Sequence, residues 1–110
     1  MGNYVVTKRT NGEFQFNLKA GNGQVILTSE GYTSKANCLS GIDSVKRNSK
    51  DDAKFERKTA KNGKFYFNLM ATNGQVIGTS EMYDTEAARD NGIASVKTNG
   101  PEGPVVDQAQ

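Results

Sequence analysis

Two segments of this chain carry nearly the same sequence. Residues 11–48 align with residues 62–99 at a constant offset of 51 without a gap, and 23 of the 38 aligned positions are identical. Self-similarity of this length indicates a tandem duplication, in which each copy is one supersecondary unit. We therefore expect residues 1–110 to form one pseudo-twofold domain, built from repeat one (3–50) and repeat two (54–99).

The middle of each repeat has the pattern of a β-hairpin. Residues 14–20 alternate apolar and polar side chains, which is the period of a half-buried strand. Asn22-Gly23 follows and predicts a two-residue type I′ turn, whose two central residues both take positive φ. That turn pairs Leu18 with Leu27, so the apolar side chains of both strands fall on one face.

An earlier turn in each repeat, at Asn11-Gly12 and Asn62-Gly63, precedes this hairpin. A strict two-residue loop in repeat two would place Glu56 on the core face. A loop that is one residue longer, or bulged, would instead turn Phe55 inward, and Tyr4 in repeat one. We favour the longer loop because it buries the aromatic side chains.

A helix of about fourteen residues is expected after the third strand of each repeat. Ile42 and Val45 lie three positions apart and form a buried stripe, and Ile93 and Val96 form the same stripe in repeat two. Asn48 and Asn99 are expected to end the two helices. Gly41 lies inside the first helix and recurs in the second, which indicates a close approach between helix and sheet.

The expected order is therefore three strands and a helix, twice. One three-stranded sheet with a single helix buries little surface, so the repeats are expected to join edge to edge. The predicted fold class is α+β, with two tandem β-β-β-α repeats that share one antiparallel sheet and both helices packed on one face. Residues 100–110 are expected to form a C-terminal tail or a short edge strand.

The doubled motif resembles a known family. F-x-F-N-L-x-A-x-N-G-Q-V-I-x-T-S-E-x-Y, followed by G-I-x-S-V-K, occurs in both repeats and is similar to the YegP-like family of small bacterial proteins. The resemblance covers nearly all of residues 3–99, and it is specific because the motif appears twice. It implies β-β-β-α units that share one sheet, and it implies no activity, cofactor or partner.

The composition excludes several kinds of active site. The sequence contains no His, which removes Ser-His-Asp triads, Cys-His dyads and every metal site that needs imidazole. We therefore expect no enzyme activity, no cofactor and no metal. Cys38 is the only cysteine, so no intramolecular disulfide forms and a cytoplasmic location is favoured. Because Arg89 stands at the equivalent position, Cys38 is expected at the rim of the helix.

The most similar polar cluster of the two repeats surrounds Glu30 and Glu81. One interpretation is a ligand-contacting loop, or even a pair of carboxylates facing each other across the pseudo-twofold axis. The other is structural, with Tyr32 and Tyr83 packing over the edge of the core while the neighbouring hydroxyls satisfy backbone donors. The second interpretation is favoured, because duplication alone explains why the copies are alike.

The sheet face away from the helices is a candidate recognition surface, because a two-layer fold leaves it uncovered. The predicted register gives this face amide, aromatic and aliphatic side chains. Its candidate residues are Asn17, Ile26, Tyr66, Asn68, Met70 and Ile77. The alternative is that these side chains only solvate an exposed antiparallel face.

A basic segment is the second candidate site. Eight of the fourteen Lys and Arg residues fall within residues 46–64, although the net charge is only +2. Its candidate binding residues are Lys46, Arg47, Lys54, Arg57, Lys58 and Lys61. Beside an open sheet such a segment could bind single-stranded nucleic acid through phosphates and stacking. It equally serves to keep a sheet edge soluble.

These observations favour a small, non-enzymatic binding or accessory protein with a protein or small-molecule partner. The alternative is a weak single-stranded nucleic-acid binder. No stretch of the sequence has the length and apolar character of a membrane span, so no membrane partner is expected. An isolated repeat would be expected to pair with a second copy. Fusion of two repeats in one chain provides that second copy, and this predicts a monomer.

Overall fold

The computed structural model describes residues 2–109 of the chain. Repeat one contains β1 (Asn3–Lys8), β2 (Phe14–Lys19), β3 (Val25–Ser29) and α1 (Lys35–Asn48). The 3₁₀ helix η1 (Asp52–Lys54) links the repeats. Repeat two contains β4 (Phe55–Thr59), β5 (Phe65–Met70), β6 (Val76–Thr79) and α2 (Glu86–Asn99). A last strand, β7 (Val105–Asp107), follows the second helix.

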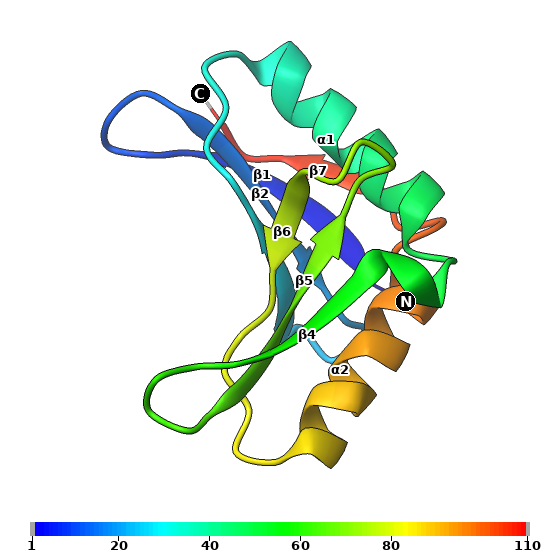
Figure 1. The fold of residues 1–110 in the computed structure, drawn as a ribbon. Coiled ribbons are helices and arrows are strands. Elements are labelled where there is room, and N and C mark those ends of the chain that lie inside the picture. The colour runs from blue at the N-terminus through cyan, green and yellow to red at the C-terminus, as the bar shows by residue number, and fades with distance from the viewer. Residues whose placement is uncertain (1, 110) are drawn as a thin grey trace.

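All seven of these strands belong to one sheet, in the order β4-β5-β6-β3-β2-β1-β7. Both helices lie on one side of the sheet, and the turns of the β1–β2 and β4–β5 hairpins project on the other side (Figure 1). The predicted α+β fold of two β-β-β-α repeats in one sheet is confirmed. One detail differs: β7 pairs with β1 in parallel, so the sheet is antiparallel except at this edge.

The repeats join through β3 and β6, and the pairing places equivalent residues opposite each other. Thr28 pairs with Thr79, which is the same position 51 residues later. The pseudo-twofold axis therefore passes through the sheet between these two threonines.

The turn at Asn22-Gly23 differs from the predicted type I′ geometry. The Gly23 N–H donates to the Ala20 carbonyl oxygen at 2.9 Å, and the Ala20 N–H donates to the Gln24 carbonyl oxygen at 2.9 Å. This is a three-residue loop in which only Gly23 takes positive φ, at 86°. The Asn22 carboxamide oxygen accepts from the Gln24 N–H at 3.0 Å, so the Asn stabilises the turn with its side chain instead of adopting positive φ.

The expected pairing of Leu18 with Leu27 is nevertheless confirmed. The longer loop shifts the register by one residue, so that Lys19 pairs with Val25. A β-bulge at Ile26 then shifts it back. The favoured register at the earlier turns is confirmed as well, because Tyr4 and Phe55 are 0% and 6% exposed.

The core lies between the sheet and the two helices. Its largest fully buried side chains include Tyr4, Phe16, Leu18, Leu27, Ile42, Phe67, Leu69 and Ile93. Ser34 and Thr85 cap the helices by accepting from the backbone N–H three residues on, at 3.1 and 3.0 Å. Both helices end at the expected asparagines.

Candidate functional site

The sheet face opposite the helices carries a continuous row of paired residues. The row crosses all seven described strands through Val106, Val5, Asn17, Thr28, Thr79, Asn68 and Glu56. At its centre the Thr79 hydroxyl donates to the Asn68 carboxamide oxygen at 2.8 Å. The Asn68 amide then donates to the Glu56 carboxylate at 3.1 Å. We call Asn17, Thr28, Tyr66, Asn68, Met70 and Thr79 the open face.

Four of the six residues predicted for this face lie on it. Tyr66, Asn68 and Met70 are partly exposed and alternate along β5 with the buried Phe67 and Leu69. Asn17 alternates in the same way with its buried neighbours on β2. Each of the four therefore presents its side chain on the side away from the helices.

The prediction was wrong for Ile26 and Ile77. Both side chains belong to the core, with exposed fractions of 5% and 4%. The reason is the bulge, since an extra residue in one strand interrupts the strict alternation of faces on which the prediction depended. Lys19 pairs directly with Val25, which leaves Ile26 as the extra residue of β3.

The fold does not gather the predicted basic residues into one patch. Arg57 lies on the helix side of β4, where its guanidinium contacts Asp52 at 3.4 Å and Asp90 at 3.2 Å. Lys58 follows it on the opposite face of the strand and lies 3.8 Å from Glu56.

The other four predicted basic residues lie on three further elements. The Lys46 ammonium group lies 5.7 Å from the centre of the Tyr4 ring, and the neighbouring Arg47 is exposed on α1. Lys54 ends η1, while Lys61 lies in the loop at the far end of β4. The six residues thus belong to three elements and a loop, and the two on β4 lie on its opposite faces and pair with carboxylates.

Glu30 and Glu81 do not face each other. Each lies two residues from the central threonine pair, but in opposite directions, because β3 and β6 are antiparallel. At about 3.3 Å per residue their α-carbons are on the order of 13 Å apart, which excludes a shared carboxylate site.

The structural interpretation of the neighbouring tyrosines is confirmed. Tyr32 and Tyr83 are partly buried and pack against the core. Each hydroxyl group lies over a helix glycine, Tyr32 over Gly41 and Tyr83 over Gly92, and a Cβ atom added at either glycine would clash with it. The close helix–sheet approach inferred from these glycines is therefore a contact with a tyrosine.

The buried serines beside these tyrosines satisfy strand backbone and not the start of a helix. The Ser29 hydroxyl accepts from the Phe16 N–H at 2.9 Å and donates to the Glu30 carbonyl oxygen at 2.8 Å. Ser80 makes the same pair of hydrogen bonds, to the Phe67 N–H at 3.0 Å and the Glu81 carbonyl oxygen at 2.8 Å.

Cys38 is fully buried in the core and does not lie at the helix rim as expected. The comparison with Arg89 misled because that side chain is also buried, with its guanidinium 5.7 Å from the Phe65 ring centre. Burial raises the pKa of the Cys38 thiol, and the charge of Asp107 raises it further. A thiol held protonated in the core is a poor nucleophile.

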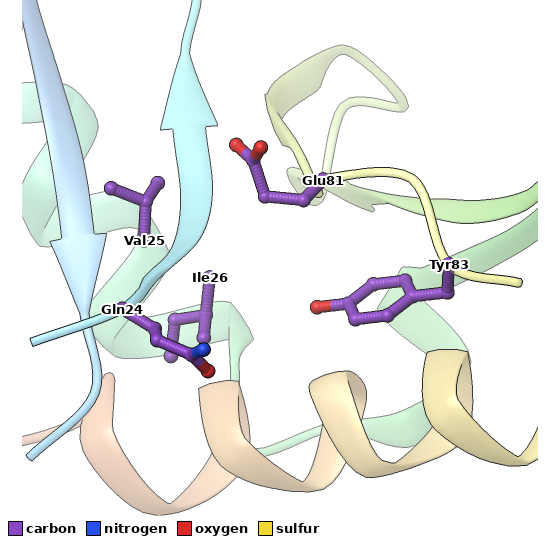
Figure 2. Close-up of a pocket in the computed structure, with 5 residues that line it drawn as sticks. All are labelled: Gln24, Val25, Ile26, Glu81 and Tyr83. Carbon is purple, nitrogen blue, oxygen red and sulfur yellow. The ribbon is translucent and has the colours of Figure 1, made fainter. Parts of the chain in front are cut away.

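A pocket of about 300 Å³ lies at the junction of the repeats, lined by Gln24, Val25, Ile26, Glu81 and Tyr83. Glu81 and Tyr83 point from the segment between β6 and α2 toward the start of β3 (Figure 2). The sequence singled out Glu81 and Tyr83, but it gave no signal that residues 24–26 of the other repeat would join them.

Within residues 2–109 there is no group of three or more His, Cys, Asp or Glu side chains placed to hold a metal ion. In the same part of the chain, no helix has both the length and the apolar character needed to cross a membrane.

Fold and sites together define a small two-layer protein in which two fused β-β-β-α repeats share one sheet. The family model for a domain of unknown function, DUF1508, matches twice, at residues 10–56 and 60–107. The chain therefore belongs to the DUF1508 family, and the resemblance to YegP-like proteins is confirmed.

Known relatives support this assignment over the whole chain. A UPF0339 protein of Bordetella pertussis is 58% identical over 110 residues, which cover 100% of this chain and 99% of the relative. The solution NMR structure of YegP from E. coli matches with a TM-score of 0.94 at 53% identity, over 98% of this chain and 93% of that one.

A UPF0339 protein of Shewanella oneidensis matches with a TM-score of 0.93 at 53% identity, over 98% and 92% of the two chains. The E. coli structure is described as that of a protein of unknown function. The relatives thus establish the family and the fold, and the function has to be inferred from the candidate site.

Proposed function

We propose that the protein is a non-enzymatic binding protein that recognises a protein partner through its open face. The observation that carries this proposal is the row of paired side chains across the whole sheet, on a face that no other described element covers. Amide and hydroxyl groups at its centre, with Tyr66 and Met70 beside them, match the composition of recognition surfaces better than that of a merely solvated sheet.

The charges around the open face favour a protein over a nucleic acid. Lys19 and Lys58 flank it, but Glu56 lies on the same face and pairs with both Asn68 and Lys58. The affinity of a phosphate-binding surface comes from Lys and Arg that replace counterions, and a carboxylate beside them opposes it. Mixed charge around amides and hydroxyls is instead complemented by a protein surface that carries polar groups and charges of both signs.

The candidate reactive groups support a non-enzymatic role. Glu30 and Glu81 are too far apart to share a proton or a substrate atom, and burial keeps the Cys38 thiol protonated. With no His in the sequence, there is no imidazole base to activate a hydroxyl or a thiol.

The proposal includes a monomer that acts in the cytoplasm. Pairing of β3 with β6 inside one chain covers the edge that an isolated repeat would present to a second copy. The outer edge strand β4 carries Glu56, Arg57 and Lys58, and such charges oppose edge-to-edge association. Sedimentation equilibrium should give the monomer mass, and a stable dimer would contradict this part of the proposal.

The test is photo-crosslinking in the cell from a reactive amino acid at position 66, with position 94 on the exposed side of α2 as the matched control. A discrete protein adduct is expected from position 66, is expected to disappear with Met70→Lys, and is expected to persist with Ala94→Lys. Equal adducts from both positions would contradict the proposal.

The nucleic-acid alternative is tested separately by an amide NMR titration with short single-stranded oligonucleotides at low and moderate salt. We expect no shifts on the open face. Shifts there that fade as salt rises would replace the protein partner by a nucleic acid.

A further inference from the structure

The pocket at the repeat junction forms because β3 and β6 diverge after a short stretch of pairing. Their pairing covers Thr28 with Thr79 and Ser29 with Gly78. Continued by two residues, the same register would place Ile26 opposite Glu81. Instead the chain follows β5, since the Ser80 N–H donates to the Phe67 carbonyl oxygen at 2.9 Å. The gap between the diverging strands is the pocket.

The walls of this pocket differ in chemistry. Val25 and Ile26 form an apolar side on β3, and the Gln24 carboxamide lies beside them. Opposite, the Glu81 carboxylate and the Tyr83 hydroxyl point toward the same space (Figure 2). The site thus combines one full negative charge, an aromatic ring and a short hydrocarbon wall.

The charge of Glu81 is available to a ligand. Among residues 2–109, seven of the twelve Asp and Glu side chains form ion pairs with Lys or Arg, and Glu81 is one of the five that do not. The ion-paired carboxylates are Glu13, Asp52, Glu56, Asp84, Glu86, Asp90 and Asp107. A protein of net charge +2 that leaves this carboxylate unpaired beside an apolar wall presents an acceptor for an external cation.

The tyrosine strengthens the same preference. Burial raises the pKa of the Tyr83 hydroxyl, and the negative charge of Glu81 raises it further. Tyr83 therefore stays neutral at physiological pH and adds no second negative charge. Its hydroxyl offers a hydrogen bond, and the face of its ring attracts cations.

We propose that this pocket binds the end of an aliphatic chain that carries an ammonium or guanidinium group, with the cation on Glu81 and the methylene groups along Val25 and Ile26. A volume of about 300 Å³ lies at the lower end of ligand sites. It suits a lysine or arginine side chain of a partner, or one end of a free diamine.

The duplication places the same residue types at the other side of the axis. Gln75, Val76 and Ile77 of repeat two are the equivalents of residues 24–26, and Glu30 and Tyr32 of repeat one are the equivalents of Glu81 and Tyr83. Each set takes its acid and tyrosine from one repeat and its apolar wall from the other. Such a site is complete only when two repeats are joined through β3 and β6.

The five residues that line the pocket are not among those that define the open face, and the two tests use different probes and variants, so the two proposals fail independently. The direct test is an NMR titration of the full chain, labelled at backbone amides and isoleucine methyl groups, with Nα-acetyl-lysine amide and with 1,5-diaminopentane. We expect saturable shifts at Ile26 and Glu81. Nα-acetyl-norleucine amide, which has the same chain length without the ammonium group, is expected not to bind.

Two variants make the test specific. Glu81→Gln keeps the shape of the side chain, leaves the fold intact because residue 81 is exposed, and is expected to weaken amine binding at least about tenfold. Asp43→Asn removes one charge from the exposed face of α1 and is the matched control, with unchanged affinity expected.

The two probes also distinguish the source of the ligand. Tighter binding of the lysine derivative assigns the pocket to a side chain of a protein partner, whereas tighter binding of the diamine assigns it to free amines. Absence of shifts with both probes at millimolar concentration would overturn the proposal, as would equal binding of the norleucine derivative or of the Glu81→Gln variant.

Discussion

The side chain of Leu27 occupies the space that a side chain at Gly78 would need. These residues are equivalent positions of the two repeats, yet a Cβ atom added at Gly78 would lie 2.8 Å from Leu27 Cγ. Close to the pseudo-twofold axis, two identical large residues would compete for one volume. The duplicated chain resolves this conflict with a leucine in one repeat and a glycine in the other, so the core at the axis is asymmetric.

This packing predicts strong coupling between the two positions. Gly78→Ala is expected to lower the free energy of unfolding by about 1–3 kcal/mol, because the added methyl group overpacks the core against Leu27. In a Leu27→Ala background the same substitution should cost much less, with a coupling energy of about 1 kcal/mol or more. Urea unfolding of the four proteins measures the cycle, and additive effects would show that the two side chains do not share this space.

Much of the fold could be predicted because it depends on patterns that occur twice. Alternation in β2 and the helix stripe of Ile42 and Val45 each indicated one element, and the duplication showed that both repeats form it. Edge-to-edge joining then followed from the small surface that one repeat can bury. Such inferences are local or generic, so a single sequence is enough for them.

The parts that failed depend on single residues that break a pattern. One bulge moved Ile26 from the open face into the core, and nothing in the sequence marks a bulge at that position. Sequence proximity also suggested a basic patch, although successive strand residues such as Arg57 and Lys58 point to opposite faces. The pocket was missed because Gln24 and Glu81 come from different repeats and meet only through the β3–β6 pairing.

The buried Ser80 hydroxyl should contribute measurably to stability. Ser80→Ala leaves the Phe67 N–H without its acceptor inside the core, which is expected to cost about 1–3 kcal/mol in the free energy of unfolding. Ser40→Ala on the exposed side of α1 is the matched control, with an expected change within about 0.5 kcal/mol. If chemical denaturation finds the two variants equally stable, the hydroxyl is not required to satisfy this donor.

Acid should weaken the contact between the repeat linker and repeat two. The Lys97 ammonium group at 2.7 Å and the Arg57 guanidinium at 3.4 Å lower the pKa of Asp52 below its ordinary value of 3.8. Because the folded pKa is the lower one, this carboxylate stabilises the fold at pH values above 3.8 and loses that effect as the pH falls through the folded pKa.

Asp52→Asn is therefore expected to be less stable than the parent protein at pH 7 and equally stable near the acid limit of the folded state. The difference should be small and should shrink in high salt, since Asp52 is exposed. Asp43→Asn, which removes a carboxylate with no ion-pair partner among the described residues, is the control. Urea midpoints across the pH range measure the effect, and a constant difference at all pH values would contradict it.

The contact between Tyr83 and Gly92 should decide whether alanine at position 92 stabilises or destabilises the protein. Alanine at an interior helix position is favoured over glycine by about 1 kcal/mol. At Gly92, however, its Cβ atom would lie 2.5 Å from the Tyr83 hydroxyl oxygen and 2.9 Å from Cζ. The steric conflict is therefore expected to cancel the stabilisation that alanine would otherwise give. Gly92→Ala should also displace the ring of Tyr83, which lines the pocket at the repeat junction.

In a Tyr83→Ala background the ring is absent, and Gly92→Ala should then stabilise the protein by up to about 1 kcal/mol. Thermal or urea unfolding of the single and double variants measures this reversal of sign. The displaced ring should also weaken binding of the lysine derivative in the Gly92→Ala protein, which links helix packing to the pocket. A stabilising effect of Gly92→Ala in the presence of Tyr83, with amine affinity unchanged, would show that the ring moves aside freely and does not hold the helix at this distance.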